Sequence, residues 1–372
     1  MLYLIKGGGN MNRRLLSIIL IAAMVSFVLA GCSGFGYADD GKLMGYSNGK
    51  VGVSMPAKEL QRWNQDGANI QSALETAGYE VELQYASNDS ETQISQIEGM
   101  IDSGCEVLVI AAVDSDALSK VLEPAREKGI PVIAYDRMIN NSKAVSYYAS
   151  FDNYGIGIEM GEYIRDELGL DNAAGPLYME IVGGDLADNN AKYIYIGAMD
   201  VLQPYIDGGK LVVKSGQIDF ETVATPKWST QTAQDRLDTI LSENYADGTT
   251  LSAVLCASDS VALGVENSLE ANYTGVWPII TGQDCDIANI KNMIAGKQSM
   301  SIFKDTRVLS SKTVEMVGAL MQGSEPPLND TKTYDNGTGV IPAYLCEPVS
   351  VDIDNYKKLL IDSGYYQESD LH

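Results

Sequence analysis

The amino-acid sequence predicts an α/β fold built from two doubly wound lobes of parallel sheet that are joined by a three-segment hinge. From residue 50 onward, short apolar runs of the length of buried strands alternate with longer stretches of helical spacing. About ten such units exceed one comfortable sheet, and 372 residues leave room for two domains. Repeated alternation of this kind favours parallel sheets that are covered by helices on both faces.

The first element, residues 1–31, is predicted to be a lipoprotein signal peptide. Arg13 and Arg14 precede an almost wholly apolar stretch, which ends in Leu-Ala-Gly-Cys at residues 29–32. That stretch, about 16 residues, is short for a membrane-spanning helix, which needs ~20. The ending resembles a bacterial lipobox, so we expect Cys32 to be acylated and to anchor the chain in the lipid bilayer. An ordinary signal peptide with a chance cysteine is the alternative, and residues 32–44 are predicted to be a tether.

The predicted strands follow in order, with helical patterns between them. They lie at residues 51–54, 81–85, 107–112, 131–135, 177–182, 211–213, 253–256 and 278–281. Crossovers between lobes are expected near residues 151–153, 283–286 and 325–327. The first lobe would hold residues 45–152 and 286–327, and the second lobe would hold residues 153–285 and 328–372.

Composition excludes several classes of function. The formal net charge is −24, and removing residues 1–31, which hold three basic and no acidic residues, makes it more negative. Such a chain repels phosphate backbones, so we expect no nucleic-acid partner. The single histidine is His372, which leaves no internal Ser-His-Asp machinery and no histidine-based zinc site. We therefore expect no catalytic residue, no metal and no cofactor; glycines 155, 157 and 161 lack the dinucleotide-binding spacing and are interpreted as packing on a sheet.

Four cysteines follow Cys32 in the sequence, at positions 105, 256, 285 and 346. Cys105 and Cys256 flank or lie in apolar runs, which favours buried thiols over a disulfide. The sequence alone leaves the pairing open.

Polar residues stand directly after the apolar runs. Ligands of open α/β sheets bind beyond the carboxyl ends of strands, so these residues are candidates for a lined cleft. They include Asp136 and Arg137, Asp259, Asp284 and Lys304. A lone aspartate there is more simply explained as a helix cap. Six polar strand ends in one chain favour a site.

The chemistry of these candidates fits a neutral polyol. Carboxylates accept from sugar hydroxyls, and an arginine can donate to two oxygens. Trp63, beside Arg62, is a candidate plate for the apolar face of a sugar ring, with a core tryptophan as the alternative. Asp188 and Asn190 open another helix, where a plain N-cap is the alternative. The mixture of signs indicates that the ligand is not an anion.

Several ordered strings of this sequence are characteristic of a known family. They are Arg62-Trp63, residues 93–98 (Gln-Ile-Ser-Gln-Ile-Glu), 132–140 (Val-Ile-Ala-Tyr-Asp-Arg-Met-Ile-Asn), 188–191 (Asp-Asn-Asn-Ala), 204–211 (Pro-Tyr-Ile-Asp-Gly-Gly-Lys-Leu), 282–284 (Gly-Gln-Asp), 302–304 (Ile-Phe-Lys) and 329–334 (Asn-Asp-Thr-Lys-Thr-Tyr). From about Gly45 to the C-terminus, the chain resembles the periplasmic-binding-protein-like type 1 solute receptors of sugar ABC importers. Within them it is most similar to the xylose-binding and multiple-monosaccharide-binding group.

The resemblance implies a set of ligand-binding residues. Positions that match Arg62, Asp136, Arg137, Asp188, Asn190, Asp284 and Lys304 bind sugar hydroxyls and the ring oxygen in that family. The position that matches Trp63 stacks on the ring. Xylose binders carry an asparagine where Ser258 stands, so we expect Asp259 to take that role. They carry a second stacking tryptophan where Gln217 aligns, so we expect Gln217 to contact the ligand.

The resemblance also implies a function. We expect a monomeric, lipid-anchored receptor on the outer face of the cytoplasmic membrane, which captures an aldose of the galactose, glucose, arabinose or xylose type. Its two lobes would close on the sugar and dock on the permease subunits of an ABC transporter. A receptor that passes a sugar or autoinducer signal to a membrane sensor remains the alternative, since its site would be nearly identical. A sugar-responsive repressor would need an N-terminal DNA-binding helix pair where the export signal stands, and a glycosidase would leave the cations and Trp63 unexplained.

Overall fold

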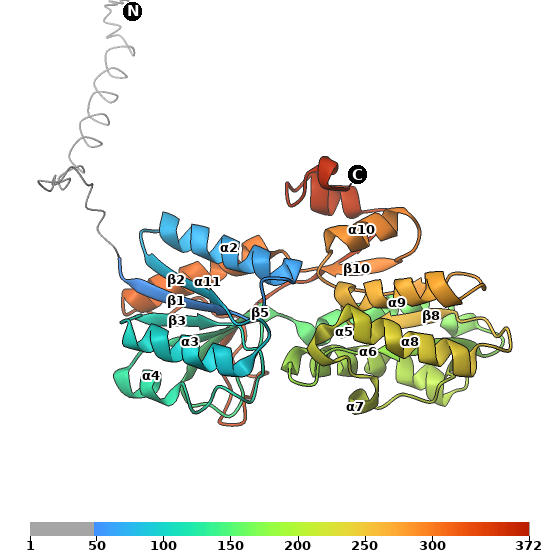
Figure 1. Ribbon diagram of the computed structural model, residues 1–372, viewed down its shortest axis with the longest axis horizontal. Helices are drawn as coiled ribbons and strands as arrows, with labels where there is room; N and C mark the ends of the chain where they lie inside the picture. The colour runs from blue at the N-terminus through green and yellow to red at the C-terminus, as the bar shows by residue number, and fades with distance from the viewer. Residues whose placement is uncertain (1–47, 372) are drawn as a thin grey trace, which may run out of the picture. The chain divides into compact units, whose positions relative to one another are not determined.

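The computed structural model describes residues 48–371. The predicted signal peptide, the acylation site Cys32 and the tether lie outside the described residues. Within them, helices and strands alternate along most of the chain, and the predicted α/β class with parallel sheets is confirmed (Figure 1).

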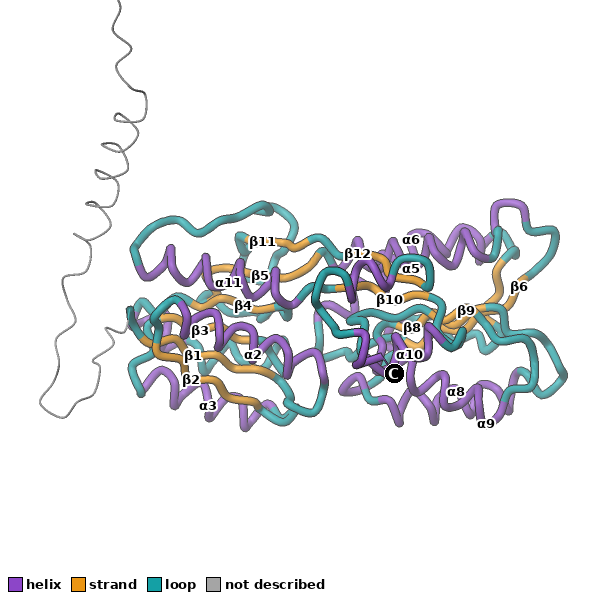
Figure 2. The backbone as a smooth tube through the Cα atoms, turned by 90° about the horizontal axis from the view of Figure 1, so that it is seen from above, coloured by secondary structure: helices purple, strands orange, loops and turns teal. Residues whose placement is uncertain are grey.

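The first sheet has six strands in the order β11-β5-β4-β3-β1-β2, and every neighbouring pair is parallel (Figure 2). Helices cover both faces, with α2 and α11 on one and α3 and α4 on the other (Figure 1). The bounds are β1 (Lys50–Met55), α2 (Gln61–Thr76), β2 (Glu80–Tyr85), α3 (Ser90–Asp102), β3 (Val107–Ile110), α4 (Glu123–Lys128), β4 (Val132–Tyr135), β5 (Val145–Phe151), α11 (Thr306–Met321) and β11 (Ala343–Cys346).

Strand β3 shows why its sequence is apolar throughout. Val107 and Val109 pack into the core under α2, whereas Leu108 and Ile110 pack into the core under α3. Side chains alternate between the two faces of a strand, so a strand covered on both faces needs apolar residues at every position.

The second sheet has four parallel strands in the order β7-β6-β8-β9. Its elements are α5 (Asn153–Glu167), η1 (Leu170–Asn172), β6 (Leu177–Val182), α6 (Asn189–Asp207), β7 (Leu211–Val213), α7 (Phe220–Val223), η2 (Pro226–Trp228), α8 (Thr230–Asn244), β8 (Ala253–Cys256), α9 (Asp259–Asn272) and β9 (Ile279–Ile280). Helices α5 and α6 pack closely because Gly157 and Gly197 face the partner helix: a Cβ at Gly157 would lie 2.1 Å from the carbonyl oxygen of Ile194. Gly157 and Gly161 thus serve helix–helix packing, not the packing on a sheet that the sequence suggested, whereas a Cβ at Gly155 would meet the side chain of Asp152.

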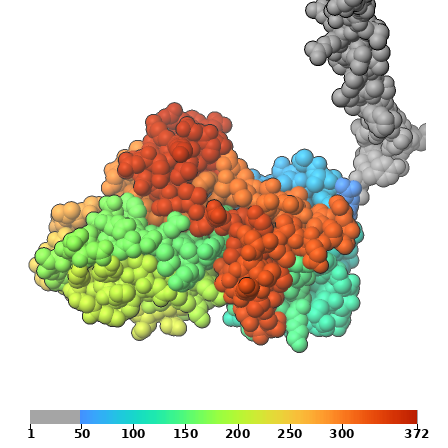
Figure 3. All heavy atoms as spheres, turned by 180° about the vertical axis from the view of Figure 1, so that it is seen from behind, coloured from blue at the N-terminus to red at the C-terminus, as the bar shows by residue number. Residues whose placement is uncertain are grey.

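A two-stranded antiparallel sheet pairs β10 (Met300–Phe303) with β12 (Val349–Asp352). Around it lie α10 (Ile287–Ile294) and the C-terminal turns η3 (Lys357–Ile361) and η4 (Glu368–Leu371), which share a small core that includes Tyr366 and Leu371. The C-terminal residues, red in Figure 3, form a raised group of atoms on the surface.

Strand β11 differs from the predicted lobe boundaries. The sequence prediction assigns residues 328–372 to the second lobe, whereas Ala343–Cys346 pairs with β5 at the edge of the six-stranded sheet. The pairing covers an edge of β5 that would otherwise leave backbone groups unpaired. The lobe boundaries as a whole stay a prediction.

Three further features concern function. Among the described residues, none of the helices combines the length and apolar character needed to cross a membrane. In the same part of the chain, no group of three or more acidic, histidine or cysteine side chains is placed to hold a metal ion. Cys105, Cys256, Cys285 and Cys346 are buried free thiols, which confirms the interpretation of Cys105 and Cys256.

Candidate functional site

A cavity lies where the ends of the two parallel sheets meet the loop before α10. Eight of the ten predicted ligand-binding residues line it: Arg62, Trp63, Asp136, Arg137, Asp188, Asn190, Asp284 and Lys304. Leu60, Trp228, Ser258, Ser260, Gln283 and Asp286 complete the lining. The structure therefore brings together residues that stand up to 244 positions apart in the sequence.

The ends of strands and the starts of helices explain this convergence. Asp136 follows β4 and Lys304 follows β10, so each side chain leaves its strand at the carboxyl end. Arg62 and Trp63 stand in the first turn of α2. Asp188 is the N-cap of α6, where its side chain accepts a hydrogen bond from the backbone N–H of Asn190 at 3.0 Å.

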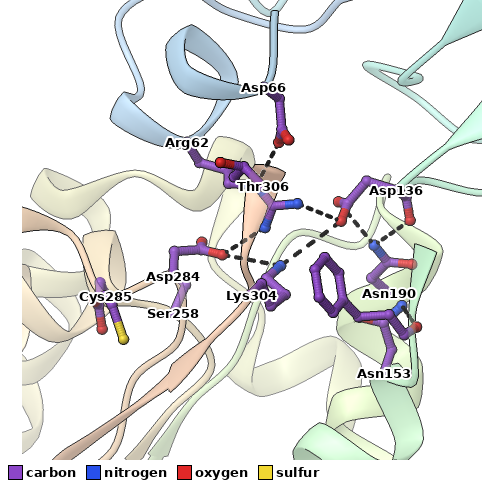
Figure 4. A network of polar contacts seen from close by, with 12 residues as sticks. Arg62, Asp66, Asp136, Asn153, Asn190, Ser258, Asp284, Cys285, Lys304 and Thr306 are labelled. Carbon is purple, nitrogen blue, oxygen red and sulfur yellow. Dashed lines mark hydrogen bonds and ion pairs between the residues drawn. The ribbon is translucent and has the colours of Figure 1, made fainter. Parts of the chain in front are cut away.

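Arg62 is the central cation of the cavity and is buried. Its Nη2 lies 2.9 Å from Oδ1 of Asp136, its Nη1 lies 2.9 Å from Oδ1 of Asp284, and its Nε donates to Asp66 (Figure 4). Burial alone would lower the pKa of Arg62, but these three carboxylates outweigh it and raise the pKa well above its ordinary value. The guanidinium is thus a fixed positive group whose donors are already oriented.

Asp136 links strand β5 to helix α6 at the cavity. Its backbone adopts a left-handed φ of 57°, and its carbonyl oxygen accepts hydrogen bonds from Tyr148, Ser150 and Asn190 at 2.8, 2.8 and 2.9 Å. Burial would raise the pKa of its carboxyl group, but Lys304, Arg62 and Arg137 lower it below the ordinary value. The group is therefore ionised at neutral pH and can accept hydrogen bonds.

Arg137 forms the second ion pair and is also buried. Its Nε lies 2.8 Å from Oδ2 of Asp188, and its Nη1 donates to the carbonyl oxygen of Ala112 at 3.0 Å. The guanidinium carbon lies 4.9 Å from the centre of the Trp63 ring, within cation–π range. On the other side, the indole N–H of Trp228 donates to Oδ2 of Asp188 at 3.2 Å.

Lys304 is the third buried cation. Its Nζ lies 3.0 Å from Oδ1 of Asp284, the oxygen that Arg62 also contacts, and 3.9 Å from Oδ1 of Asp136 (Figure 4). No donor among the described residues contacts Oδ2 of Asp284. That oxygen is available to a ligand.

Two predicted residues do not reach the cavity. Gln217 lies outside it, where its side-chain oxygen accepts a hydrogen bond from Arg236. Asp259 is the first residue of α9 and is fully buried behind the cavity lining, where it accepts hydrogen bonds from Gln298 and Ser301 at 2.8 Å each. Its neighbour Ser258, which caps the helix, lines the cavity instead.

The sequence prediction did not include Trp228, which supplies the second aromatic wall. Lys227 and Trp228 adopt left-handed φ values of 58° and 53° in an irregular segment before α8. No strand or helix pattern marks that segment. Trp228, one of three tryptophans in the chain, was itself the sequence feature that could have indicated this wall.

Asp286 is another lining residue that the sequence prediction did not include. Burial, and next the nearby Asp284 carboxylate, raise its pKa to about 7, although Arg62 and Lys304 oppose the shift. Its Oδ1 and the side-chain oxygen of Gln283 are buried without a hydrogen-bond partner among the described residues. Buried polar atoms normally have partners, so two such oxygens on residues that line one cavity mark a place for donor groups.

The cavity chemistry follows from these contacts. Arg62, Arg137 and Lys304 face four carboxylates, those of Asp136, Asp188, Asp284 and Asp286. Each cation lies against a carboxylate of the protein, so the site offers no surplus positive charge to an anion. Two indole rings and many fixed acceptors and donors suit a small neutral ligand with hydroxyl groups and an apolar face.

Comparisons with known proteins agree with this chemistry. A family model described as a periplasmic binding protein domain matches residues 51–325. The multiple sugar-binding periplasmic receptor ChvE of Rhizobium radiobacter is 50% identical over 327 residues, which cover 87% of this chain and 92% of the relative. The D-xylose-binding periplasmic protein of Escherichia coli (strain K12) is 34% identical, with 87% and 92% covered.

Solved structures extend the comparison. An ABC transporter solute-binding protein from Clostridium phytofermentans, crystallised with bound β-D-glucose, is 64% identical, with a TM-score of 0.86 and coverage of 87% of this chain and 100% of the other. A carbohydrate transporter solute-binding protein from Chloroflexus aurantiacus, in complex with D-glucose, is 33% identical, with a TM-score of 0.77 and coverage of 86% and 97%.

Proposed function

The chain belongs to the periplasmic binding protein domain family, and on that premise we propose that it captures a monosaccharide in the cavity and delivers it to the permease of an ABC transporter. The ligand would be an aldose of the glucose, galactose, arabinose or xylose type, with D-glucose first among them. Relatives of 64% and 33% identity hold D-glucose in their crystal structures, which supports this choice.

The observation that carries the proposal is the arrangement of Asp284 between two cations. Arg62 and Lys304 both contact its Oδ1, at 2.9 and 3.0 Å, which fixes the carboxylate and leaves Oδ2 to a ligand hydroxyl. A carboxylate fixed in this way presents its other oxygen in one orientation, which favours affinity. The unpaired oxygens of Gln283 and Asp286 could accept from further hydroxyls.

The two indoles support a ring-shaped ligand. Trp63 has one face against Arg137, and Trp228 is held by its hydrogen bond to Asp188. A pyranose or furanose has an apolar C–H face that packs on an aromatic ring. The proposal is binding without turnover, because the three cations of the cavity are engaged in ion pairs with Asp136, Asp188 and Asp284.

The proposal for the membrane end of the molecule rests on the sequence alone. Leu29-Ala30-Gly31-Cys32 would direct acylation of Cys32 and tether the binding unit outside the cytoplasmic membrane. Cys32→Ser should then release the protein from membranes, and mass spectrometry of the N-terminal peptide should lose the acyl groups. Full membrane retention of this variant would contradict the anchor.

A thermal-shift screen of residues 33–372 against D-glucose, galactose, arabinose, xylose, fucose and ribose tests the ligand class. A ligand present at about 100 times its dissociation constant adds about 2.7 kcal/mol of stability, which raises the melting temperature by several degrees. We expect such a shift with one or a few of these aldoses, and recovery of the sugar chemically unchanged. No shift with any aldose would overturn the proposal.

A further inference from the structure

The loop that presents Asp284 to the cavity rests on Asp259, which itself does not line the cavity. We propose that Asp259 is the positioning residue of the ligand-binding loop at residues 282–286, and that its carboxylate holds Asp284 in the orientation that binds the sugar. This inference rests on the proposed function and assigns a role to a residue that acts through another.

The loop needs such support because its backbone is in an unfavourable conformation. Asp284 and Cys285 have φ values of 97° and 53°, a region that residues other than glycine seldom occupy. Two consecutive residues in this region persist only where surrounding contacts define them. The hydrogen bonds of residues 284–286 supply such contacts.

Three consecutive backbone N–H groups of the loop are bound. That of Asp284 donates to the carbonyl oxygen of Ile302 at 2.9 Å, that of Cys285 to Oγ of Ser301 at 3.1 Å, and that of Asp286 to Oδ2 of Asp259 at 2.8 Å. The hydroxyl of Ser301 in turn donates to Oδ1 of Asp259 at 2.8 Å. The Asp259 carboxylate therefore fixes Asp286 directly and Cys285 through Ser301.

Asp259 also holds the start of the loop. Its backbone N–H donates to the carbonyl oxygen of Gln283 at 2.9 Å. Gly282 passes so close that a Cβ there would lie 2.1 Å from Oδ1 of Asp259. The carboxylate therefore lies directly against the loop at both Gly282 and Asp286.

The site requires a carboxylate and not an amide. Oδ1 accepts from both Ser301 and Gln298, and Oδ2 accepts from the N–H of Asp286, so donors face both oxygens. An asparagine would direct its NH₂ group at one of these donors. Asp259→Asn preserves size and shape, and it should loosen the loop specifically.

Glu180 supplies a matched control. It is a fully buried carboxylate in β6, it lies outside the cavity lining, and it also accepts from three donors, namely the N–H and hydroxyl of Ser215 and the hydroxyl of Tyr245. Glu180→Gln should therefore perturb stability through the same physical cause without touching the loop.

The experiment combines hydrogen exchange of the sugar-free proteins with calorimetric titration of D-glucose. In Asp259→Asn, the peptide that covers residues 284–286 should exchange at least tenfold faster than in wild type, whereas Glu180→Gln should leave it unchanged. Glucose affinity should fall about tenfold in Asp259→Asn only. Adding Asp284→Asn to Asp259→Asn should cost much less affinity than adding it to wild type, because both act through one carboxylate.

Equal exchange of this peptide in wild type and Asp259→Asn, or additive losses in the double variant, would overturn the inference. If Asp259→Asn does not fold, Ser301→Ala tests the same contact, with faster exchange at Cys285 expected and unchanged exchange contradicting it. The exchange measurement needs no sugar. A wild-type protein that binds none of the aldoses would therefore reject the proposed function while the exchange measurement still tests the loop inference.

Discussion

Arg62 and Asp284 are 222 residues apart in the sequence, yet Nη1 of the arginine lies 2.9 Å from Oδ1 of the aspartate. The contact joins the first turn of α2, on the six-stranded sheet, to the loop before α10. The ion pair fixes the orientation of the Asp284 carboxylate at the cavity.

The first prediction concerns this carboxylate. Asp284→Asn removes the charge that Arg62 and Lys304 both contact, and a lost charge-assisted hydrogen bond to the ligand costs about 1.5–3 kcal/mol. D-glucose affinity measured by calorimetry should fall about 10- to 100-fold. The exposed Asp354→Asn is the control and should bind like wild type; equal affinities for both variants would remove Asp284 from the site.

The second prediction concerns the tryptophan that the sequence prediction did not include. Trp228→Phe removes the hydrogen bond to Asp188 and part of the aromatic surface on which the sugar ring would pack. The two losses together cost about 1 kcal/mol of binding free energy, so sugar affinity should fall about fivefold. Trp277→Phe is the matched control, because its indole N–H donates to the carbonyl oxygen of Lys297 away from the cavity. If fluorescence titration gives both variants wild-type affinity, Trp228 does not contact the sugar.

The third prediction separates arginine from lysine at position 137. The guanidinium of Arg137 contacts Asp188, Ala112 and the Trp63 ring together, and the single ammonium of a lysine cannot reproduce these contacts. Arg137→Lys should weaken glucose binding about tenfold. Arg165→Lys, on the partly exposed α5 pair with Glu162, should bind normally, and an unchanged affinity of Arg137→Lys would show that charge alone suffices.

The fourth prediction concerns the pH dependence of stability. Burial raises the pKa of Glu266 to about 7, above its ordinary value of 4.5, and its Oε1 has no partner among the described residues. Between these pH values the folded protein binds more protons than the unfolded chain, so the free energy of unfolding falls as pH rises from about 4.5 to 7.

Glu266→Gln cannot ionise and should escape that loss. Relative to wild type, its free energy of unfolding should rise by about 2 kcal/mol between pH 5 and pH 8, as measured by urea denaturation. Asp66 and Asp286, whose pKa values are raised to about 6 and about 7, contribute equally to both proteins and cancel. The exposed Glu243→Gln should show no such change; parallel curves for wild type and Glu266→Gln would contradict the prediction.

The sequence predicted most of the fold and eight of the lining residues for a clear physical reason. Fully apolar runs such as residues 107–110 mark strands buried on both faces, and the carboxyl ends of parallel strands meet at one edge. Asp136 follows such a strand, whereas Lys304 follows β10, whose partner β12 is antiparallel, and both could be assigned from their position at a strand end. Arg62, Trp63, Asp188 and Asn190 became definite candidates only through the family resemblance.

The positions of the remaining site residues depend on local contacts that leave no periodic pattern in the sequence. Asp259 follows an apolar run as Asp136 does, but it turns away from the cavity because Gln298 and Ser301 donate to it from behind. Trp228 belongs to a left-handed turn after a four-residue helix. The sequence prediction placed the second aromatic wall at Gln217, which is 11 positions before Trp228. Strand β11 joined the first sheet because β5 had an open edge, which is a tertiary effect.

A crystal structure of residues 33–372 grown with D-glucose tests the central claim most directly. We expect one sugar in the cavity, with its ring against Trp63 or Trp228 and a hydroxyl within hydrogen-bond distance of Oδ2 of Asp284. An empty cavity at saturating glucose, or a sugar bound elsewhere on the protein, would contradict it.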